Sequence, residues 1–235
     1  MGGSFILGLI PARGGSKGIP RKNLRVIGGK PLLEYTVEAA LNSALLSLVV
    51  TSTEDAEIAR AARAAGSEVI DRPSELARDE TPTLPVAQHA VEIVEREHGR
   101  RLDAIVILQV TTPFRTGEDI DRAVAMLLHS SADSVVSVRE AQELHPWKLK
   151  RIQEGRLVPL MEEEVEGTRR QDLPPVYIRN GGIYAVRRDV LMVENSLYGQ
   201  NCQAYVMPVE RSIDINTELD LVLAEALLER GIVRF

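Results

Sequence analysis

The sequence of 235 residues has a single cysteine, Cys202. One cysteine excludes an internal disulfide and a metal centre built from several thiolates, and it fits a reducing compartment. A Gly-x-Ser-x-Gly elbow is also missing, which argues against a serine hydrolase. The few histidines lack the spacing of metal ligands; they are His89, His98, His129 and His145.

Long apolar runs are missing as well. The apolar segment at residues 5–10 is far too short to span a bilayer. The start of the chain lacks the basic front and small-residue cleavage site of a signal peptide, and Ile6 stands where a myristoylation site needs Ser or Thr. We therefore expect a cytoplasmic protein with no membrane partner.

Positive charge is in deficit, since 28 Lys and Arg residues face 34 Asp and Glu residues, for a formal net charge of -6. This balance argues against a nucleic-acid partner, for which a basic surface is typical. A local basic pocket can still bind a small polyanion, because the field inside a cleft matters more than the net charge.

Short apolar runs alternate with helical patterns, which favours one α/β domain spanning residues 1–235 with a mostly parallel sheet and helices on both faces. Strands are expected at 5–10, 48–50, 68–70, 104–108, 134–138, 182–186 and 204–208. Helices are expected at 31–44, 54–65, 84–98, 118–129 and 217–229. We expect the last helix to be capped by Thr217 or Asn216 and to turn its apolar residues inward; these are Leu219, Val222, Leu223 and Ala226.

The alternation breaks between residues 140 and 176. A polar hairpin is expected at 148–159 with its turn at Glu154-Gly155, and residues 161–171 are acidic, then basic, and poor in apolar side chains. We interpret 140–176 as an insertion that forms a dimerisation arm, and a mobile surface loop is the alternative.

A glycine-rich basic segment follows the first strand directly, where loops of an open α/β sheet form the ligand crevice. Gly14 and Gly15 permit close backbone approach, and their amides can cradle phosphate oxygens. It is neither the Gly-x-x-x-x-Gly-Lys-Ser/Thr loop nor Gly-x-Gly-x-x-Gly, so a dinucleotide-binding oxidoreductase is remote. A basic surface loop is the plain alternative. The cations that suit a triphosphate here are Arg13, Lys17, Arg21 and Lys22.

The run Ile10-Pro-Ala-Arg-Gly-Gly-Ser-Lys-Gly-Ile-Pro-Arg-Lys-Asn23 resembles the N-terminal signature of the acylneuraminate cytidylyltransferases. The resemblance implies a Rossmann-like nucleotide-diphospho-sugar transferase fold and binding of CTP. It assigns the triphosphate to Arg13, Lys17 and Lys22. The other residues that it places around CTP in this segment are Ala12, Gly14, Ser16 and Asn23.

Two further segments carry the resemblance. Arg72-Pro-Ser-Glu-Leu-Ala77, followed by Asp79, Thr81 and Thr83, is similar to the family segment around the cytosine and ribose, and implies base recognition by Arg72, Thr81 and Thr83. Leu108-Gln-Val-Thr-Thr-Pro-Phe-Arg115 is similar to the family segment whose glutamine contacts the sugar acid, which implies that role for Gln109 beside Thr111. Without the resemblance, these segments are ordinary turns.

The resemblance continues in the third quarter of the chain. Arg170-Gln171 and the run Tyr177-Ile-Arg-Asn-Gly-Gly-Ile-Tyr184 imply sugar contacts by Arg170, Gln171 and Asn180. A guanidinium suits a carboxylate because it can bind it in bidentate fashion. Arg179 stands one place later than in many relatives, so it is a sugar contact or a surface charge.

The run Ser212-Ile-Asp-Ile-Asn-Thr-Glu-Leu-Asp-Leu221 is similar to the family ending whose first two aspartates serve Mg²⁺. Asp214 keeps the first position, while Asn216 replaces the second and can offer only a carbonyl oxygen. Asn216 as a helix cap is the alternative. We expect Asp220, within the helix, to be a solvated or capping charge.

Together the segments imply a nucleotidyltransferase that joins CMP from CTP to a nine-carbon keto acid sugar and works as a homodimer. The catalytic candidates are Arg13, Lys17, Lys22 and Asp214. The alternatives are a legionaminic, pseudaminic or eight-carbon ulosonic acid as the sugar, or a regulatory relative without turnover. No residue stands out as the catalytic base.

Overall fold

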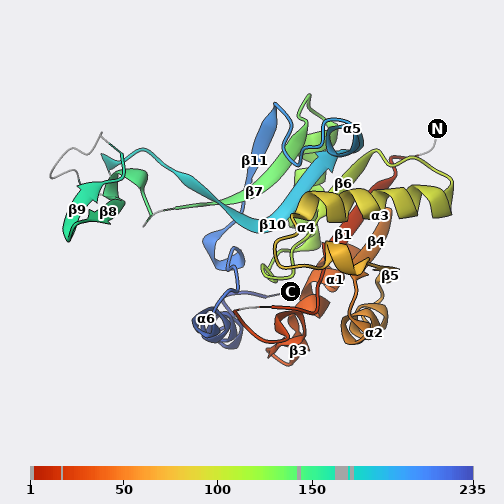
Figure 1. The fold of residues 1–235 in the computed structure, drawn as a ribbon, viewed down its shortest axis with the longest axis horizontal. Coiled ribbons are helices and arrows are strands. Elements are labelled where there is room, and N and C mark those ends of the chain that lie inside the picture. The colour runs from red at the N-terminus through yellow and green to blue at the C-terminus, as the bar shows by residue number, and fades with distance from the viewer. Residues whose placement is uncertain (1–2, 17, 142–143, 162–168, 170–171, 235) are drawn as a thin grey trace.

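The computed structural model describes residues 3–16, 18–141, 144–161, 169 and 172–234. Their central feature is a seven-stranded sheet in the order β11-β7-β10-β6-β1-β4-β5 (Figure 1). Its strands are β1 (Ile6–Pro11), β4 (Leu48–Thr53), β5 (Glu68–Asp71), β6 (Ala104–Ile107), β7 (Ser134–Glu140), β10 (Tyr177–Arg187) and β11 (Cys202–Val206). Every neighbouring pair is parallel except those of β10, which runs antiparallel to β6 and β7. The predicted mostly parallel sheet is confirmed.

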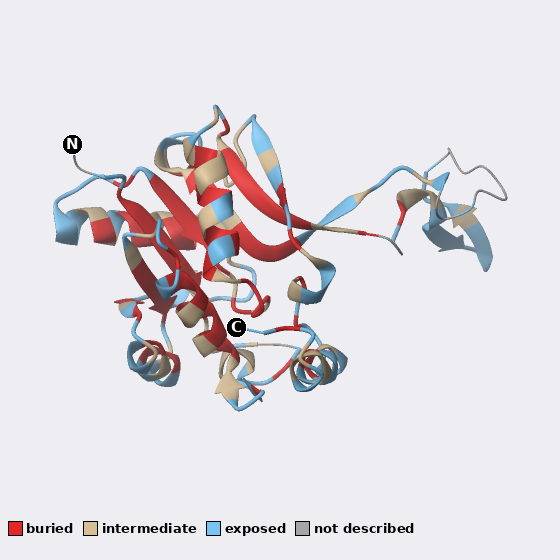
Figure 2. Cartoon of the chain, turned by 180° about the vertical axis from the view of Figure 1, so that it is seen from behind, coloured by how far each residue is buried: buried red, intermediate tan, exposed pale blue. Residues whose placement is uncertain are grey.

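Helices cover both faces of this sheet, as predicted. One face carries α1 (Leu32–Leu41), α2 (Ala56–Ala64) and α4 (Gly117–Leu128), and the other carries α3 (Thr83–His98) and α5 (Arg188–Met192). Because strands covered on both sides must be apolar along their whole length, the run at β1 is almost wholly buried (Figure 2). Within the described part of the chain, no helix combines the length and the apolar character that a membrane crossing requires.

The carboxyl ends of β1, β4 and β6 meet at one edge of the sheet, because these strands are parallel neighbours. The loops that leave this edge are residues 12–31, which hold the short hairpin β2 (Val26–Ile27) and β3 (Lys30–Pro31), and residues 108–116 before α4. Loops at this edge form the ligand crevice of open α/β sheets. The edge therefore positions the candidate site.

The described residues between β7 and β10 depart from the sheet as an arm. The hairpin of β8 (Lys150–Gln153) and β9 (Arg156–Pro159) lies apart from the main body, at the end of long extensions of β7 and β10 (Figure 1). Its turn has positive φ at Glu154 and Gly155, where it was predicted. Ile152 and Leu157 face each other across the hairpin and are 77% and 73% exposed.

The last helix, α6 (Glu218–Glu229), begins as predicted at Thr217, whose hydroxyl and the carboxylate of Asp220 form a capping box. The prediction for its inward face was wrong. Leu221 and Ala224 are buried, whereas Leu219, Val222 and Leu223 are exposed. The helix packs against β2 of the short hairpin, and only a narrow stripe of it reaches the core.

Candidate functional site

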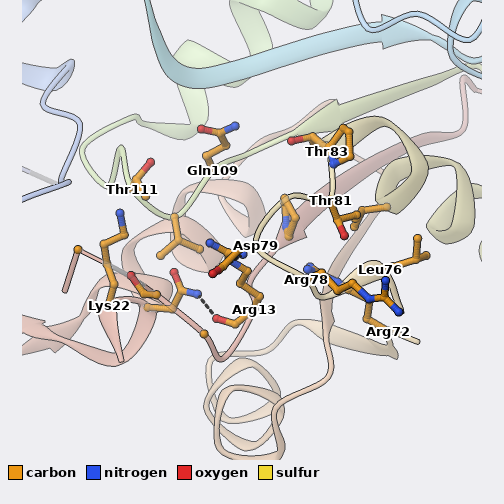
Figure 3. A pocket seen from close by; sticks show the side chains of 18 of the residues that line it. Arg13, Lys22, Arg72, Leu76, Arg78, Asp79, Thr81, Thr83, Gln109 and Thr111 are labelled. Atoms are coloured by element: carbon orange, nitrogen blue, oxygen red, sulfur yellow. Dashed lines mark hydrogen bonds and ion pairs between the residues drawn. The ribbon is translucent and has the colours of Figure 1, made fainter. Parts of the chain in front are cut away.

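A cavity of about 490 Å³ opens at the carboxyl edge of β1, β4 and β6 (Figure 3). Most of the residues singled out in the sequence line it, although they come from four separate segments of the chain. They are Arg13, Ser16, Lys22, Asn23, Arg72, Thr81, Thr83, Gln109, Thr111 and Asn216. Lys17, Arg170 and Gln171 lie outside the described residues.

The basic loop after β1 is held in shape by its own residues and by the chain near residue 215. The Asn23 side-chain amide donates to the Arg13 carbonyl at 2.8 Å. The Lys22 ammonium donates to the Ile215 carbonyl at 2.8 Å and to Asn216 Oδ1 at 3.2 Å. Burial lowers the pKa of Lys22, and the Asp214 carboxylate opposes that shift. Lys22 is thus a fixed, partly desolvated cation at the cavity wall.

Arg21 does not join the other cations, contrary to the sequence prediction. Its backbone is left-handed, with φ at 55°, and its guanidinium points to the carboxylates of Asp55, at 2.6 Å, and Glu57. Arg21 is absent from the lining of the cavity. The sequence shows four nearby cations, but the direction of each one depends on the backbone of a loop.

Close packing explains why two positions of the loop are glycine. A Cβ on Gly14 would stand 2.6 Å from Asp55 Oδ2, and a Cβ on Gly18 would stand 2.6 Å from the Asn216 carbonyl. Gly15 has open space around it. The Gly14 amide, predicted to cradle a phosphate, donates to Glu54 Oε1 at 2.7 Å. An incoming phosphate would have to take the place of this carboxylate.

Two predicted nucleotide contacts are buried beside the cavity. Ala12 is fully buried, and its amide donates to the Ser52 carbonyl at 3.0 Å. Arg72 lines the cavity while donating to Ser52 Oγ at 3.2 Å and to the Ser52 carbonyl at 2.5 Å. Burial lowers the pKa of Arg72, and the charge of Glu54 opposes that shift. Ser52 thereby anchors two segments that lie far apart in the sequence.

Sequence reasoning missed Arg78 as a residue of the lining. It also missed that the carboxylate of Asp79, which lines the cavity too, pairs with Arg13. The Arg13 guanidinium lies 2.7 Å from Asp79 Oδ1. Asp79 was noted only as part of a motif between Arg72 and Thr81. Its position directly after a cavity-lining turn was the available signal, but the ion pair depends on how the loop folds back.

The loop after β6 contributes Gln109 and Thr111 to the cavity, as predicted. The Thr111 carbonyl accepts from the Ile215 amide at 2.8 Å. Gly181 has a positive φ of 75°, and a Cβ there would stand 3.0 Å from Gln109 Oε1. Glycine at this position leaves room for the Gln109 side chain.

Asn180 does not line the cavity. It is 3% exposed, its Oδ1 accepts from Ser137 Oγ at 2.6 Å, and its Nδ2 donates to Ser212 Oγ at 2.8 Å. Its direct contact with a sugar stays a prediction, while its observed contacts join β7, β10 and the chain at Ser212. Asn180 therefore positions backbone near the site.

Arg179 points to a second, smaller hollow of about 220 Å³ on the sheet surface of β7 and β11. Its guanidinium donates to the Tyr198 hydroxyl and lies 5.2 Å from the centre of that ring. Arg179 is therefore neither a cavity residue nor a free surface charge. Its contact with a sugar stays a prediction.

Asp214 and Asn216 lie beside Lys22. Asn216 Nδ2 donates to Asp214 Oδ2 at 2.7 Å. Among the described residues, no group of three or more His, Cys, Asp or Glu side chains could hold a metal ion. Mg²⁺ needs only one or two carboxylates when phosphates and waters supply the other oxygens, so exposed Asp214 fits this ion. The oxygen of Asn216 already faces Lys22, so Asn216 holds Asp214, and its own ligation stays a prediction.

Comparisons with known proteins agree with this geometry. A family model described as cytidylyltransferase matches residues 7–216. The CMP-N,N'-diacetyllegionaminic acid synthase of Legionella pneumophila is 34% identical over 95% of this chain and 96% of its own length. N-acylneuraminate cytidylyltransferase A of Danio rerio is 32% identical over 94% of this chain, which spans 50% of that protein.

Among solved structures, a CMP:2-keto-3-deoxy-manno-octonic acid synthetase complexed with CTP has the same fold. It matches with a TM-score of 0.69 and 22% identity, covering 97% of this chain and 100% of that one. The resemblance carried by the loop after β1 is confirmed along nearly the whole chain. The protein is a nucleotidyltransferase that belongs to the cytidylyltransferase family.

Proposed function

We propose that this chain transfers CMP from CTP to the anomeric 2-hydroxyl of a nine-carbon keto acid sugar of the sialic acid type. The observation that carries the proposal is the cavity of about 490 Å³, which brings the cations of Arg13, Lys22 and Arg72 together with the amide of Gln109. Its volume is in the range of small-molecule sites, roughly 300–1,000 Å³.

The cavity offers different chemistry at its two sides (Figure 3). Arg13 and Lys22 come from the loop after β1 and suit the triphosphate, while Arg72, Thr81 and Thr83 line the wall assigned to cytosine and ribose. Gln109 lies across from them on the loop after β6, where its amide can donate to and accept from a sugar acid.

The reaction is a single displacement at the α-phosphate of CTP. The sugar hydroxyl loses its proton to a base, its oxygen bonds to the α-phosphorus, and the bond to the β-phosphate breaks with its electron pair on pyrophosphate. Arg13 and Lys22 stabilise the charge on the phosphate oxygens, because fixed cations in a partly dry site need no reorganisation. The predicted contribution of Lys17 has the same character.

Mg²⁺ is part of the proposal. Asp214 would hold it beside the triphosphate, and the ion would supply further charge neutralisation there. The hydrogen bond from Asn216 orients the Asp214 carboxylate, and Lys22 in turn holds the oxygen of Asn216.

The sugar has a second candidate. The Legionella pneumophila relative that matches from end to end is named for N,N'-diacetyllegionaminic acid, whereas the N-acylneuraminate enzyme of Danio rerio is about twice as long as this chain. Legionaminic acid is also a nine-carbon keto acid, so both sugars present a carboxylate and an anomeric hydroxyl. The predicted sugar contacts are Gln109, Thr111, Arg170, Gln171, Arg179 and Asn180.

We also propose a homodimer that works in the cytoplasm, where nucleoside triphosphates are kept. The support for the dimer is the arm, whose hairpin exposes Ile152 and Leu157 away from the main body. Apolar side chains so exposed on a projecting hairpin are typical of a surface that another chain covers.

The test is pyrophosphate release from CTP and Mg²⁺ with N-acetylneuraminic, N,N'-diacetyllegionaminic, pseudaminic and an eight-carbon ulosonic acid, with ATP, GTP and UTP as controls. We expect release only with CTP and only when a nine-carbon sugar is present, and its relative rates name the substrate. Release with the eight-carbon acid alone would show that the substrate is an eight-carbon acid and not a nine-carbon one. Folded protein that binds CTP without turnover on any sugar would overturn the proposal and favour a regulatory role.

A further inference from the structure

Asp119 is a buried carboxylate in the first turn of α4, outside the cavity. Its side chain is 2% exposed and engages Arg211 in a bidentate ion pair, with Arg211 Nε 3.1 Å from Oδ2 and the terminal nitrogen 2.8 Å from Oδ1. The Tyr205 hydroxyl donates to Oδ1 at 2.8 Å, and the Thr116 amide donates to Oδ2 at 2.9 Å. One carboxylate thus joins α4 to β11 and to the chain beyond it.

The chain beyond it leads directly to Asp214. Arg211 ends a short 3-10 helix at Val209–Arg211, three residues before Asp214. On the other side of Asp214, the Ile215 amide donates to the Thr111 carbonyl at 2.8 Å. Asp214 is therefore held from both sides, and the upstream contacts are the hydrogen bond from Asn180 to Ser212 and the ion pair of Arg211 with Asp119.

The residue just before the N-cap of α4, Arg115, also anchors the loop that carries Gln109. Arg115 is fully buried and donates to the Gln109 carbonyl, while its Nε and one terminal nitrogen have no hydrogen-bond partner among the described residues. Burial lowers the pKa of Arg115 to about 9, and the charge of Asp119 opposes that shift. The contacts at the start of α4 thus fix the position of the loop that carries Gln109 relative to the segment that carries Asp214.

Stability alone gives a weak reason for this pair. Taking a carboxylate and a guanidinium out of water has a large free-energy cost, which their attraction offsets only in part, so buried ion pairs often add no net stability. A bidentate pair does fix direction, because two parallel hydrogen bonds hold both planar groups in one geometry.

We propose that the Asp119–Arg211 ion pair is a positioning pair for the reaction, which sets Asp214 relative to Lys22 and Gln109. The inference rests on the proposed function. The pair touches neither the cavity nor any reacting atom, and it acts through the two residues between Arg211 and Asp214, Ser212 and Ile213.

The chain contains a matched control. Glu95 and Arg188 form a second bidentate pair, with Nε 3.0 Å from Oε1 and the terminal nitrogen 2.9 Å from Oε2. This pair joins α3 to α5 near the amino end of β6, where the Arg188 amide donates to the Asp103 carbonyl. It has the same chemistry at the opposite edge of the sheet.

The experiment compares Arg211→Met, Arg211→Lys and Asp119→Asn with Arg188→Met in the full chain, and measures kcat, KM for CTP, calorimetric CTP binding and Tm. We expect kcat of Arg211→Met to fall about tenfold or more, because small misplacements near reacting groups cost that much or more. Calorimetric CTP binding without Mg²⁺ should change little, since the side chains that line the cavity stay in place. Arg211→Lys, which keeps the charge, should recover part of kcat.

Arg188→Met should lose stability to a similar degree while keeping the wild-type kcat. Equal losses of kcat in Arg211→Met and Arg188→Met, or an unchanged kcat in Arg211→Met, would overturn the inference. If Arg211→Met does not fold, Asp119→Asn and Arg211→Lys carry the same comparison. The wild-type turnover tests the proposed function separately, because the inference concerns only the ratio of variant to wild type.

Discussion

The guanidinium of Arg13 lies 2.7 Å from the carboxylate of Asp79 within the cavity assigned to CTP (Figure 3). Both side chains are about one-third exposed, so water and a ligand can reach the pair. A triphosphate that binds Arg13 must compete with a carboxylate that already holds it. We therefore expect the loop before α3, as well as the basic loop after β1, to affect the affinity for CTP.

Asp79→Asn should bind CTP several-fold more tightly, because it removes both a competitor for Arg13 and a negative charge that repels the phosphates. Calorimetric titration with CTP measures the change. Glu80→Gln is the matched control, since Glu80 is the next residue, is exposed and does not line the cavity. Weaker binding by Asp79→Asn would show that Asp79 contacts the nucleotide favourably.

Arg13→Ala should lower kcat/KM for CTP about a hundredfold, the usual effect of removing one group that stabilises developing charge. Arg25→Ala is the control, because Arg25 follows the same loop but pairs with Glu218 outside the cavity. Steady-state pyrophosphate release measures both. Equal effects of the two substitutions would mean that general loss of positive charge, and not the position of Arg13, matters.

Asn216→Asp should raise the apparent affinity for Mg²⁺ while lowering Tm by a few degrees when Mg²⁺ is absent. The new carboxylate would face Asp214 where a hydrogen bond of 2.7 Å now exists, so the two charges repel until a cation lies between them. Thermal melts and activity across a Mg²⁺ series check both parts. Loss of activity at every Mg²⁺ concentration would instead show that the amide of Asn216 is required.

Ile152→Glu combined with Leu157→Glu should convert the proposed dimer to a monomer, because a dimer interface would have to bury both charges. Light scattering after size exclusion measures the mass. Gln153→Glu places a charge on the same hairpin at a polar position and should leave the dimer intact. An unchanged mass in the double variant would place any interface elsewhere.

The contribution of Asp119 to stability should depend on pH. Burial raises the pKa of Asp119, but hydrogen bonds from Arg211, Thr116 and Tyr205 outweigh it and hold the pKa below its usual value. Because the folded pKa lies below the unfolded value of about 3.9, the ionised carboxylate stabilises the fold above that pH. This stabilisation is lost as the pH falls through the folded pKa.

The difference in unfolding free energy between wild type and Asp119→Asn should therefore shrink as the pH falls from about 5 to about 2. Urea denaturation at several pH values measures it, and Glu118→Gln, an exposed neighbour, is the control. A difference that stays constant over this range would mean that the ion pair does not perturb the titration of Asp119.

Strands and helices were largely predictable, because the periodicity of apolar residues is a local property of the sequence. The strand at β1, the hairpin turn at Glu154-Gly155 and the cap at Thr217 all lie where the sequence places them. The inward face of α6 was not predictable in this way. Its helix is apolar around most of its circumference, so periodicity alone does not say which stripe meets the core.

The candidate site was predictable where a motif sits at the end of a strand. Arg13, Lys22, Arg72 and Gln109 converge on one cavity, as expected for loops at the carboxyl edge of a parallel sheet. Arg21 belongs to the same motif and still points away, toward Asp55. Its backbone is left-handed, and the carboxylates that its guanidinium meets, Asp55 and Glu57, lie at the start of α2, far from the motif in the sequence.

The sequence by itself therefore determined the order of elements, the family and the set of charged residues that gather at one edge of the sheet, because these follow from local patterns and motifs. Only the tertiary structure decided which partner each charged side chain contacts. Arg13 with Asp79, Lys22 with Asn216 and Asp119 with Arg211 each join segments that are far apart along the chain. Side-chain pairing depends on distances of a few ångströms between such segments, and local sequence does not encode those distances.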